Sequence, residues 1–496
     1  MQRAWSSWLS VALAACAQGK AGAPPLRSGL GALHVPISSE VDSASRYFDQ
    51  GMRLWYAFEH QAAARAFAEA GRLDPACAIC RWGEGLALGP NLNAEMAPDQ
   101  ASAAARAIAR AVELRARASA RERALIDALA TRLSGTTGAD SAYAGAMADA
   151  AARFPDDVEI LTLFADALMN GRPWDYWDGA EPRPGTLRLL AALDRALSLD
   201  SLHPGACHLL IHATEAAQPG RALGCAERLA ETMPGAAHLV HMPAHLYLRL
   251  GRYDDAIAQS ERAIAVDSTA HDLYFLAFAA MLAGRETQAT AAAQAASARI
   301  SDVEARGSVL AQSIRAAPDL IATRFERWDE LLARPLPSNE LAVARALAEF
   351  ARGAAELATG AGGRAAALRD SLSTRVAAMP RGVGRALATL ARHHLEAKIA
   401  LTRGATDAAI AEVRAAAGIE RALGYQEPPW WPLPTRQALG RALLEAGRSA
   451  EAAAVFGEDL REYPGNCWSS AGLARALGTA ATERPAGASC ASRLFD

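Results

Sequence analysis

The stretch ASRYFDQGMRLWYAFEHQAAARAFAEAGRLDPAC, residues 44–77, decides the fold. Gly51 lies where two helices must touch. Ala63, Phe67 and Ala70 share one face of the second helix, because they are spaced four and three residues apart. Pro75 then ends that helix. The pattern predicts a helical hairpin whose small residues let the two backbones approach closely.

The same pattern recurs along the chain. Residues 433–466 repeat it with Gly440, Gly447, Ala452, Phe456 and Pro464, and residues 245–268 repeat it with Gly251, Tyr253, Ala256 and Ala263. These repeats resemble the tetratricopeptide repeat (TPR) superfamily, whose helix pairs span about 34 residues. The resemblance implies an all-α fold, a right-handed α-solenoid of helix hairpins whose first helices line a concave groove. One hairpin cannot bury its apolar face alone, so we expect the hairpins to stack.

Length and composition agree with a helical array. The 496 residues exceed one compact core, and aromatic residues make up only 6% while Ala dominates the apolar share, which argues against a large β-sandwich or barrel. The 51 basic and 54 acidic residues nearly cancel, leaving a net charge of −3. With no basic stripe, we expect no nucleic-acid partner.

The first residues have the parts of an export signal. Residues 1–16 combine an early Arg3 with a short apolar stretch that ends in LAAC, which resembles a lipobox with Cys16 as the lipidated residue. Ordinary cleavage near Ala17, or no export, are the alternatives. We expect an exported, periplasmic or outer-membrane-anchored bacterial lipoprotein that touches the membrane only through this anchor. The predicted order is signal peptide 1–16, flexible tether 17–40, TPR-like repeats 41–200, central His-rich repeats 201–300, TPR-like repeats 301–480 and tail 481–496.

The histidines are clustered, and this is the most informative feature of the chain. Seven of the eleven lie between residues 203 and 271. In PGACHLLIHATEA (204–216) and PGAAHLVHMPAHLYL (234–248) the polar residues recur at spacings of three and four, which places them on one face of each helix. The predicted groove-facing set is His208, His212, Glu215, His238, His241, His245 and, in the next repeat, His271.

Neighbouring helices pack about 8–10 Å apart, so imidazoles that face each other can reach one ion. Imidazole with a nearby carboxylate suits Cu, Zn or Fe, and the spacing does not choose among them. The alternatives are a polar peptide groove without metal, and packing alone. We expect His203, just before Pro204, to cap a helix or to support a ligand.

Six cysteines follow Cys16, which suits an oxidising compartment. Cys77 and Cys80 form a Cys-x-x-Cys pair, open to three interpretations: a local disulfide, a redox pair, or soft metal ligands. Cys467 and Cys490 can form a C-terminal disulfide.

Two proline-rich segments interrupt the helical pattern and are predicted to be loops: residues 171–186 and 424–436. Their tryptophans can either cover the groove as a lid or fill gaps between repeats. The residues concerned are Trp174, Trp177, Trp430 and Trp431.

The central segments also resemble a poorly characterised group of bacterial TPR proteins. The shared features are the His-rich middle, Cys77-x-x-Cys80, Gly89-Pro90-Asn91 and Glu427-Pro428-Pro429-Trp430, over most of residues 40–475. The group has no established activity to transfer. The sequence also lacks the P-loop, dinucleotide-binding and nucleophile-elbow motifs.

The sequence supports two hypotheses for the function of the chain. The first is an exported TPR-like protein with a transition-metal site, with or without catalysis on a small-molecule substrate by activation of water or dioxygen. The second is a scaffold whose groove holds a peptide or protein partner without metal.

Overall fold

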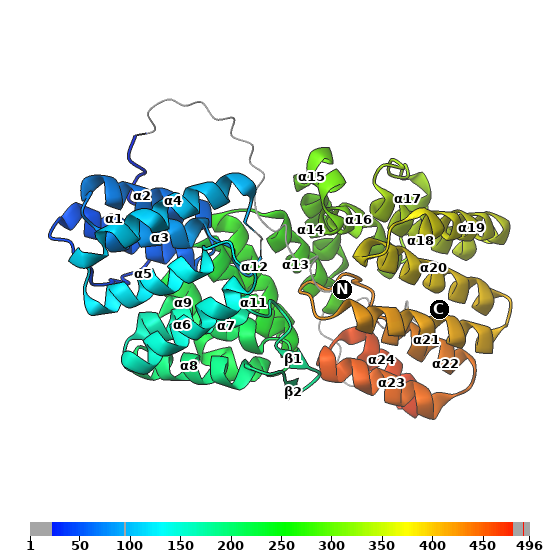
Figure 1. Cartoon of the computed structure of the whole chain (residues 1–496). Helices are drawn as coiled ribbons and strands as arrows, with labels where there is room; N and C mark the ends of the chain where they lie inside the picture. Colours follow the sequence, from blue (N-terminus) through cyan, green and yellow to red (C-terminus); the bar gives the residue numbers. More distant parts are fainter. Residues whose placement is uncertain (1–21, 94–95, 480–489, 491–496) are drawn as a thin grey trace. The chain divides into compact units, whose positions relative to one another are not determined.

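The chain is an all-α protein of consecutive helix hairpins, as the computed structural model shows (Figure 1). The structure describes residues 22–93, 96–479 and 490. It divides into two compact units, Met1–Leu246 and Tyr247–Asp496. The boundary lies within the segment predicted as central repeats. The hairpins confirm the predicted TPR-like α-solenoid class, while the predicted domain boundaries stay a prediction.

In the first unit, successive helices pack against each other in hairpins, as in α1 with α2 and α3 with α4. The elements are α1 (Asp42–Tyr56), α2 (His60–Leu73), α3 (Ala78–Leu88), α4 (Pro98–Leu114), η1 (Arg115–Arg117), α5 (Ala120–Arg132), α6 (Ala139–Arg153), α7 (Val158–Asn170), β1 (Trp177–Asp178), β2 (Glu181–Pro182), α8 (Thr186–Leu199), α9 (Pro204–Thr214), η2 (Pro219–Ala222), α10 (Leu223–Thr232) and α11 (Ala237–Arg249). The unit boundary, after Leu246, falls within α11.

The second unit continues the same sequential pairing, as in α13 with α14 and α20 with α21. Its helices are α12 (Tyr253–Val266), α13 (Ala270–Leu282), α14 (Glu286–Arg299), α15 (Asp302–Gly307), α16 (Val309–Arg324), α17 (Trp328–Ala333), α18 (Ala342–Ala358), α19 (Gly362–Ala378), α20 (Val383–Thr402), α21 (Thr406–Leu423), α22 (Thr435–Glu445), α23 (Ser449–Glu462) and α24 (Cys467–Leu477).

A phenylalanine between two glycines holds the best-matched hairpins together. A Cβ atom at Gly51 would lie 2.5 Å from the Phe67 ring, and one at Gly83 would lie 2.4 Å from the same ring. In the second unit, Phe456 lies equally close to Gly440 and Gly472. The ring of the second helix therefore occupies the space that side chains on both neighbouring helices would need. This confirms the close helix contacts predicted at Gly51 and Gly440.

The segment predicted as a flexible tether differs from that prediction where the structure describes it. Residues 22–40 lie against the first unit, with Leu30 and Val35 buried in its core. The Val35 N–H donates to Asp49 Oδ1 at 2.9 Å, and the Arg27 N–H donates to Gln50 Oε1 at 2.7 Å. Two apolar side chains and these backbone hydrogen bonds outweigh the tendency of a Gly- and Pro-rich segment to stay extended in water.

Both proline-rich segments break the helical pattern, as predicted. The first contains the short antiparallel pair β1–β2. The second joins α21 to α22 without regular structure over residues 425–434. In the described part of the chain, no helix has the length and apolarity that a bilayer span requires. The predicted signal peptide and Cys16 lie outside the described residues.

The Phe456 contact makes a direct prediction for Gly440→Ala. The added methyl would lie 2.4 Å from the ring, so we expect the second unit to lose about 1–3 kcal/mol of stability through overpacking. Gly457→Ala on the adjacent helix is the matched control, because nothing lies within 4 Å of its Cβ position, and it should stabilise slightly. Urea unfolding followed by circular dichroism measures the stability of both variants. Equal stabilities would contradict the close packing of Phe456 against Gly440.

Burial of His394 predicts a pH dependence of stability. Burial, with a smaller effect of Lys398, lowers the pKa of His394 to about 3. In the unfolded chain this pKa is about 6.5, so the unfolded chain binds the proton more tightly. Stability is therefore fully present above pH 6.5 and falls as the pH drops toward 3. Between pH 7 and 5 the unchanged chain should lose about 2 kcal/mol more than His394→Gln, by urea unfolding. An identical loss in both proteins would refute this assignment.

Candidate metal centre

Helix α9 carries the first histidines, and its N-terminus is fixed by a histidine cap. Pro204 occupies the first turn, and His203 Nδ1 accepts a hydrogen bond from the Ala206 N–H at 3.1 Å. This confirms the capping role predicted for His203. Because Nδ1 accepts, the ring proton lies on Nε2, which donates to Glu159 Oε1 at 2.9 Å.

The ring of His208 is oriented by a backbone carbonyl. Its Nδ1 lies 2.7 Å from the carbonyl oxygen of Tyr56, the last residue of α1. A carbonyl oxygen only accepts, so Nδ1 carries the proton and Nε2 of the neutral ring carries the lone pair. That Nε2 lies 3.0 Å from His238 Nε2 on α11.

The ring of His212 is held through its Nδ1, as the ring of His208 is, but by a carboxylate. Its Nδ1 lies 3.3 Å from Glu215 Oε1. Its Nε2 is buried and has no hydrogen-bond partner. A buried polar atom without a partner calls for a water or an ion. Metal-binding histidines characteristically donate their second N–H to a carbonyl or a carboxylate, as His208 and His212 do here.

The three histidines converge. One nitrogen from each of His208, His212 and His238 lies within 4.8 Å of the other two. Ligand nitrogens around a tetrahedral zinc ion lie about 3.3 Å apart, since each is about 2.0–2.1 Å from the metal. The three histidines could therefore hold a transition-metal ion.

Aromatic rings line this three-histidine group. The Phe58 ring centroid lies 4.3 Å from that of His208 and 5.3 Å from that of His238. The Trp174 ring meets His212 edge-on at 4.9 Å, and its Nε1 donates to the Leu92 carbonyl at 3.0 Å. These rings exclude water from one side of the group, which strengthens electrostatic interactions there.

Burial and neighbouring charges set the protonation states. Burial lowers the pKa of His208 well below its usual range, and the neighbouring imidazoles lower it further. Burial also lowers the pKa of His212, although Glu215 opposes the shift. Burial raises the pKa of Glu215, but the imidazoles of His245 and His212 outweigh this and lower it to about 2. His208 and His212 are therefore neutral imidazoles beside an ionised carboxylate, and neutral imidazole is the form that binds metal.

The remaining predicted residues do not all join this group. His241 Nε2 and His245 Nε2 lie 2.9 Å apart on α11 and form a second pair. Glu215, predicted among the ligands, instead contacts outer nitrogens: its Oε1 faces His212 Nδ1, and its Oε2 lies 2.8 Å from His245 Nδ1. The histidines thus form two groups in place of the single set that the helical spacing suggested. His271 lies on α13 of the second unit, and its role stays a prediction.

Three residues that shape the group were missed in the sequence. Tyr56 supplies the carbonyl for His208, and its hydroxyl donates to Glu159, the carboxylate that also holds His203. Phe58, with a positive φ of 58°, ends the turn between α1 and α2 and presents its ring to the histidines. The aromatic run WYAFEH at residues 55–60 was the available signal.

The predicted lid tryptophans separate into two sets. Beside Trp174, Trp177 donates from Nε1 to the Ala213 carbonyl at 2.7 Å, so the loop at 171–186 is anchored on α9. In the second unit, Trp431 is buried and stacks on His394 with ring centroids 4.9 Å apart, which is a packing role. Trp430 is also buried.

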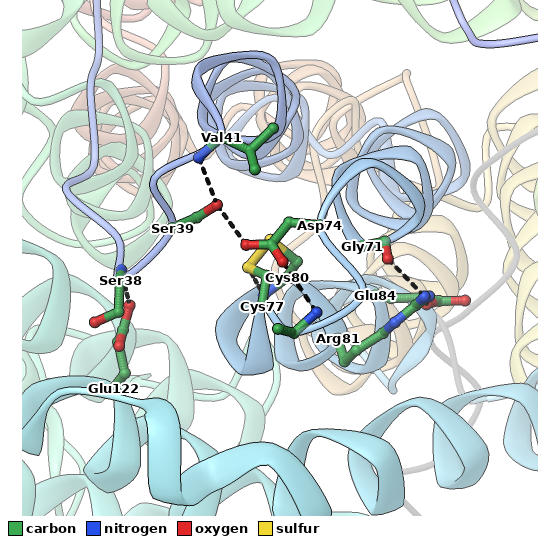
Figure 2. The surroundings of a disulfide bond; sticks show 11 residues. Ser38, Ser39, Val41, Gly71, Asp74, Cys77, Cys80, Arg81, Glu84 and Glu122 are labelled. Atoms are coloured by element: carbon green, nitrogen blue, oxygen red, sulfur yellow. Dashed lines mark hydrogen bonds and ion pairs between the residues drawn. A yellow bond between two sulfur atoms is a disulfide. The ribbon is translucent and has the colours of Figure 1, made fainter.

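The cysteines of the described chain form disulfides: Cys77–Cys80, Cys207–Cys225 and Cys467–Cys490. Figure 2 shows the first, at the N-terminus of α3, where Cys77 Sγ accepts from the Cys80 N–H at 3.2 Å. Asp74 lies beside this disulfide and accepts a hydrogen bond from Ser39 Oγ at 2.6 Å. Of the alternatives for Cys77 and Cys80, the structure has the local disulfide.

No protein-family profile and no curated protein matches the sequence. The human IFIT1 dimer with m7Gppp-AAAA is similar with a TM-score of 0.37 at 13% identity, covering 86% of this chain and 91% of that one. Yeast Tom70 gives a TM-score of 0.34 at 11% identity, covering 88% and 95%. The P58(IPK) TPR domain gives 0.22 at 12% identity, covering 88% and 97%.

The double role of His203 predicts a graded loss of stability. His203→Ala removes the cap of α9, worth about 1 kcal/mol, and the donor to buried Glu159, worth about 1–3 kcal/mol. His203→Asn should recover only the cap, because its side chain is too short to replace the imidazole donor. Urea unfolding ranks the three proteins. An Asn variant no more stable than the Ala variant would contradict the capping role.

Proposed function

We propose that this chain is an exported TPR-like protein that holds a transition-metal ion at His208, His212 and His238. The proposal rests on how the imidazole rings of His208 and His212 are oriented. The outer nitrogens of His208 and His212 face the Tyr56 carbonyl and Glu215, which directs both Nε2 lone pairs toward the three-histidine group. A polar peptide groove would not need buried imidazole nitrogens gathered within 4.8 Å of one another.

The donor set favours zinc or copper over iron. Non-haem iron oxygenases use two histidines and one carboxylate as ligands. Here Glu215 contacts the outer nitrogens, which leaves an all-imidazole set. Bound at three imidazoles, such an ion supplies Lewis acidity toward water, dioxygen or a small-molecule substrate. His208, His212 and His238 would hold the ion, while the rings of Phe58 and Trp174 keep bulk water from that side.

Export remains part of the proposal. We infer a signal peptide over residues 1–16, with lipidation at Cys16 and a periplasmic or outer-membrane-anchored location in a bacterium. The disulfides at Cys77–Cys80, Cys207–Cys225 and Cys467–Cys490 support an oxidising compartment. We also propose that the chain belongs to the His-rich group of bacterial TPR proteins, with segment boundaries at residues 200 and 300.

Metal analysis of the purified mature chain, produced with zinc, copper and iron supplied, tests the proposal. We expect the double variant His212→Ala, His238→Ala to lose one ion per chain relative to the unchanged protein. His394→Gln is the matched control, because it alters a buried histidine outside the group and should retain the metal. Circular dichroism confirms that each variant is folded.

A chain that binds none of the three metals would contradict the proposal. It would favour the alternative, in which the concave surface of the TPR-like array holds a peptide or protein partner.

A further inference from the structure

Glu215 connects the two histidine groups of the first unit. Its side chain is almost completely buried. Oε1 faces Nδ1 of His212 at 3.3 Å, and Oε2 faces Nδ1 of His245 at 2.8 Å. His212 belongs to the three-histidine group, and His245 forms a pair with His241. One carboxylate therefore orients one imidazole in each group.

The contact with Glu215 gives His245 the same tautomer as His212. An ionised carboxylate is an acceptor only, so a neutral His245 beside it carries its proton on Nδ1 and its lone pair on Nε2. This Nε2 lies 2.9 Å from Nε2 of His241. Two imidazole nitrogens that close together are held either by one shared proton or by one shared ion.

The groups are also neighbours in space. The ring centroids of His212 and His245 lie 5.9 Å apart, and those of His238 and His241 lie 6.5 Å apart. Two ions held by these nitrogens would share the single orienting carboxylate. Two-ion centres act on oxygen-containing groups, where the ions together stabilise charge on oxygen.

We infer that His241 and His245 bind a second transition-metal ion, and that Glu215 couples the two sites so that each ion strengthens binding of the other. This inference rests on the proposed function of the first group. An ion at His212 fixes the ring and, through it, the carboxylate that orients His245. By linkage, an ion at His245 strengthens the first site by the same factor. The centre then suits a small oxygen-donor ligand, such as water, hydroxide or dioxygen.

The isosteric variant Glu215→Gln separates the two sites. A glutamine offers one carbonyl oxygen, which accepts from one imidazole, and an amino group, which can only donate to the other. The second ring must then accept at Nδ1 and carry its proton on Nε2, where it can no longer bind metal. Loss of such orienting contacts weakens metal binding about 10- to 100-fold.

We would titrate the metal-free full chain with Co²⁺ and Zn²⁺, following visible absorption and elemental analysis. The unchanged chain should bind two ions, and Glu215→Gln should bind one tightly and the second at least about 10-fold more weakly. Glu69→Gln is the control, because Glu69 is a buried carboxylate of the same unit whose partner is Arg72. It should bind both ions as the unchanged chain does.

A second variant keeps the test valid if Glu215→Gln does not fold. His212→Ala should weaken the remaining binding at His241 and His245, because the carboxylate loses its fixed partner. An unchanged chain that binds only one ion would overturn the inference and leave the proposed function intact. Two ions with equal affinities in all variants would overturn the coupling. A chain that binds no ion would contradict the proposed function itself.

Discussion

The hydrogen bond from His208 Nδ1 to the Tyr56 carbonyl sets the chemistry of the histidine group. A neutral imidazole has one proton and one lone pair, so an obligate acceptor on one side assigns the lone pair to the other. Glu215 imposes the same choice on His212 and His245. In their neutral form, these three rings direct basic nitrogens inward.

This constraint depends on the repeat architecture. Tyr56 ends α1, and His208 lies on α9, which packs against α1 although the sequence between them spans 152 residues. The carbonyl reaches the ring because the first hairpins pack closely. Gly51 and Gly83 leave room for Phe67 to lie between neighbouring helices, and Gly205 leaves similar room for the Tyr56 ring. Small residues at the helix contacts thus set the distance at which the imidazole is held.

The sequence predicted those features that depend on local periodicity. Helical spacing placed His208 with His212 on one face of α9, and Pro204 marked where that helix begins. It did not predict the division into two groups, since the inward-facing nitrogen depends on acceptors supplied by other helices. Glu215 illustrates the limit. Its position in the chain suggested a ligand, whereas its neighbours in space make it an orienting group for two rings.

The disulfide at Cys207 bears on which ligands the centre can use. Cys207 precedes His208 in α9 and is bonded to Cys225 on α10. A free thiol there would offer a soft ligand within one residue of an imidazole, and thiolates compete strongly for zinc and copper. A sulfur held in a disulfide has no thiolate to offer. Oxidation therefore keeps the donor set to imidazole nitrogens, and it also ties α9 to α10, which limits movement of the helix that carries His208 and His212. An oxidising compartment would thus favour both the geometry and the ligand chemistry of the proposed centre.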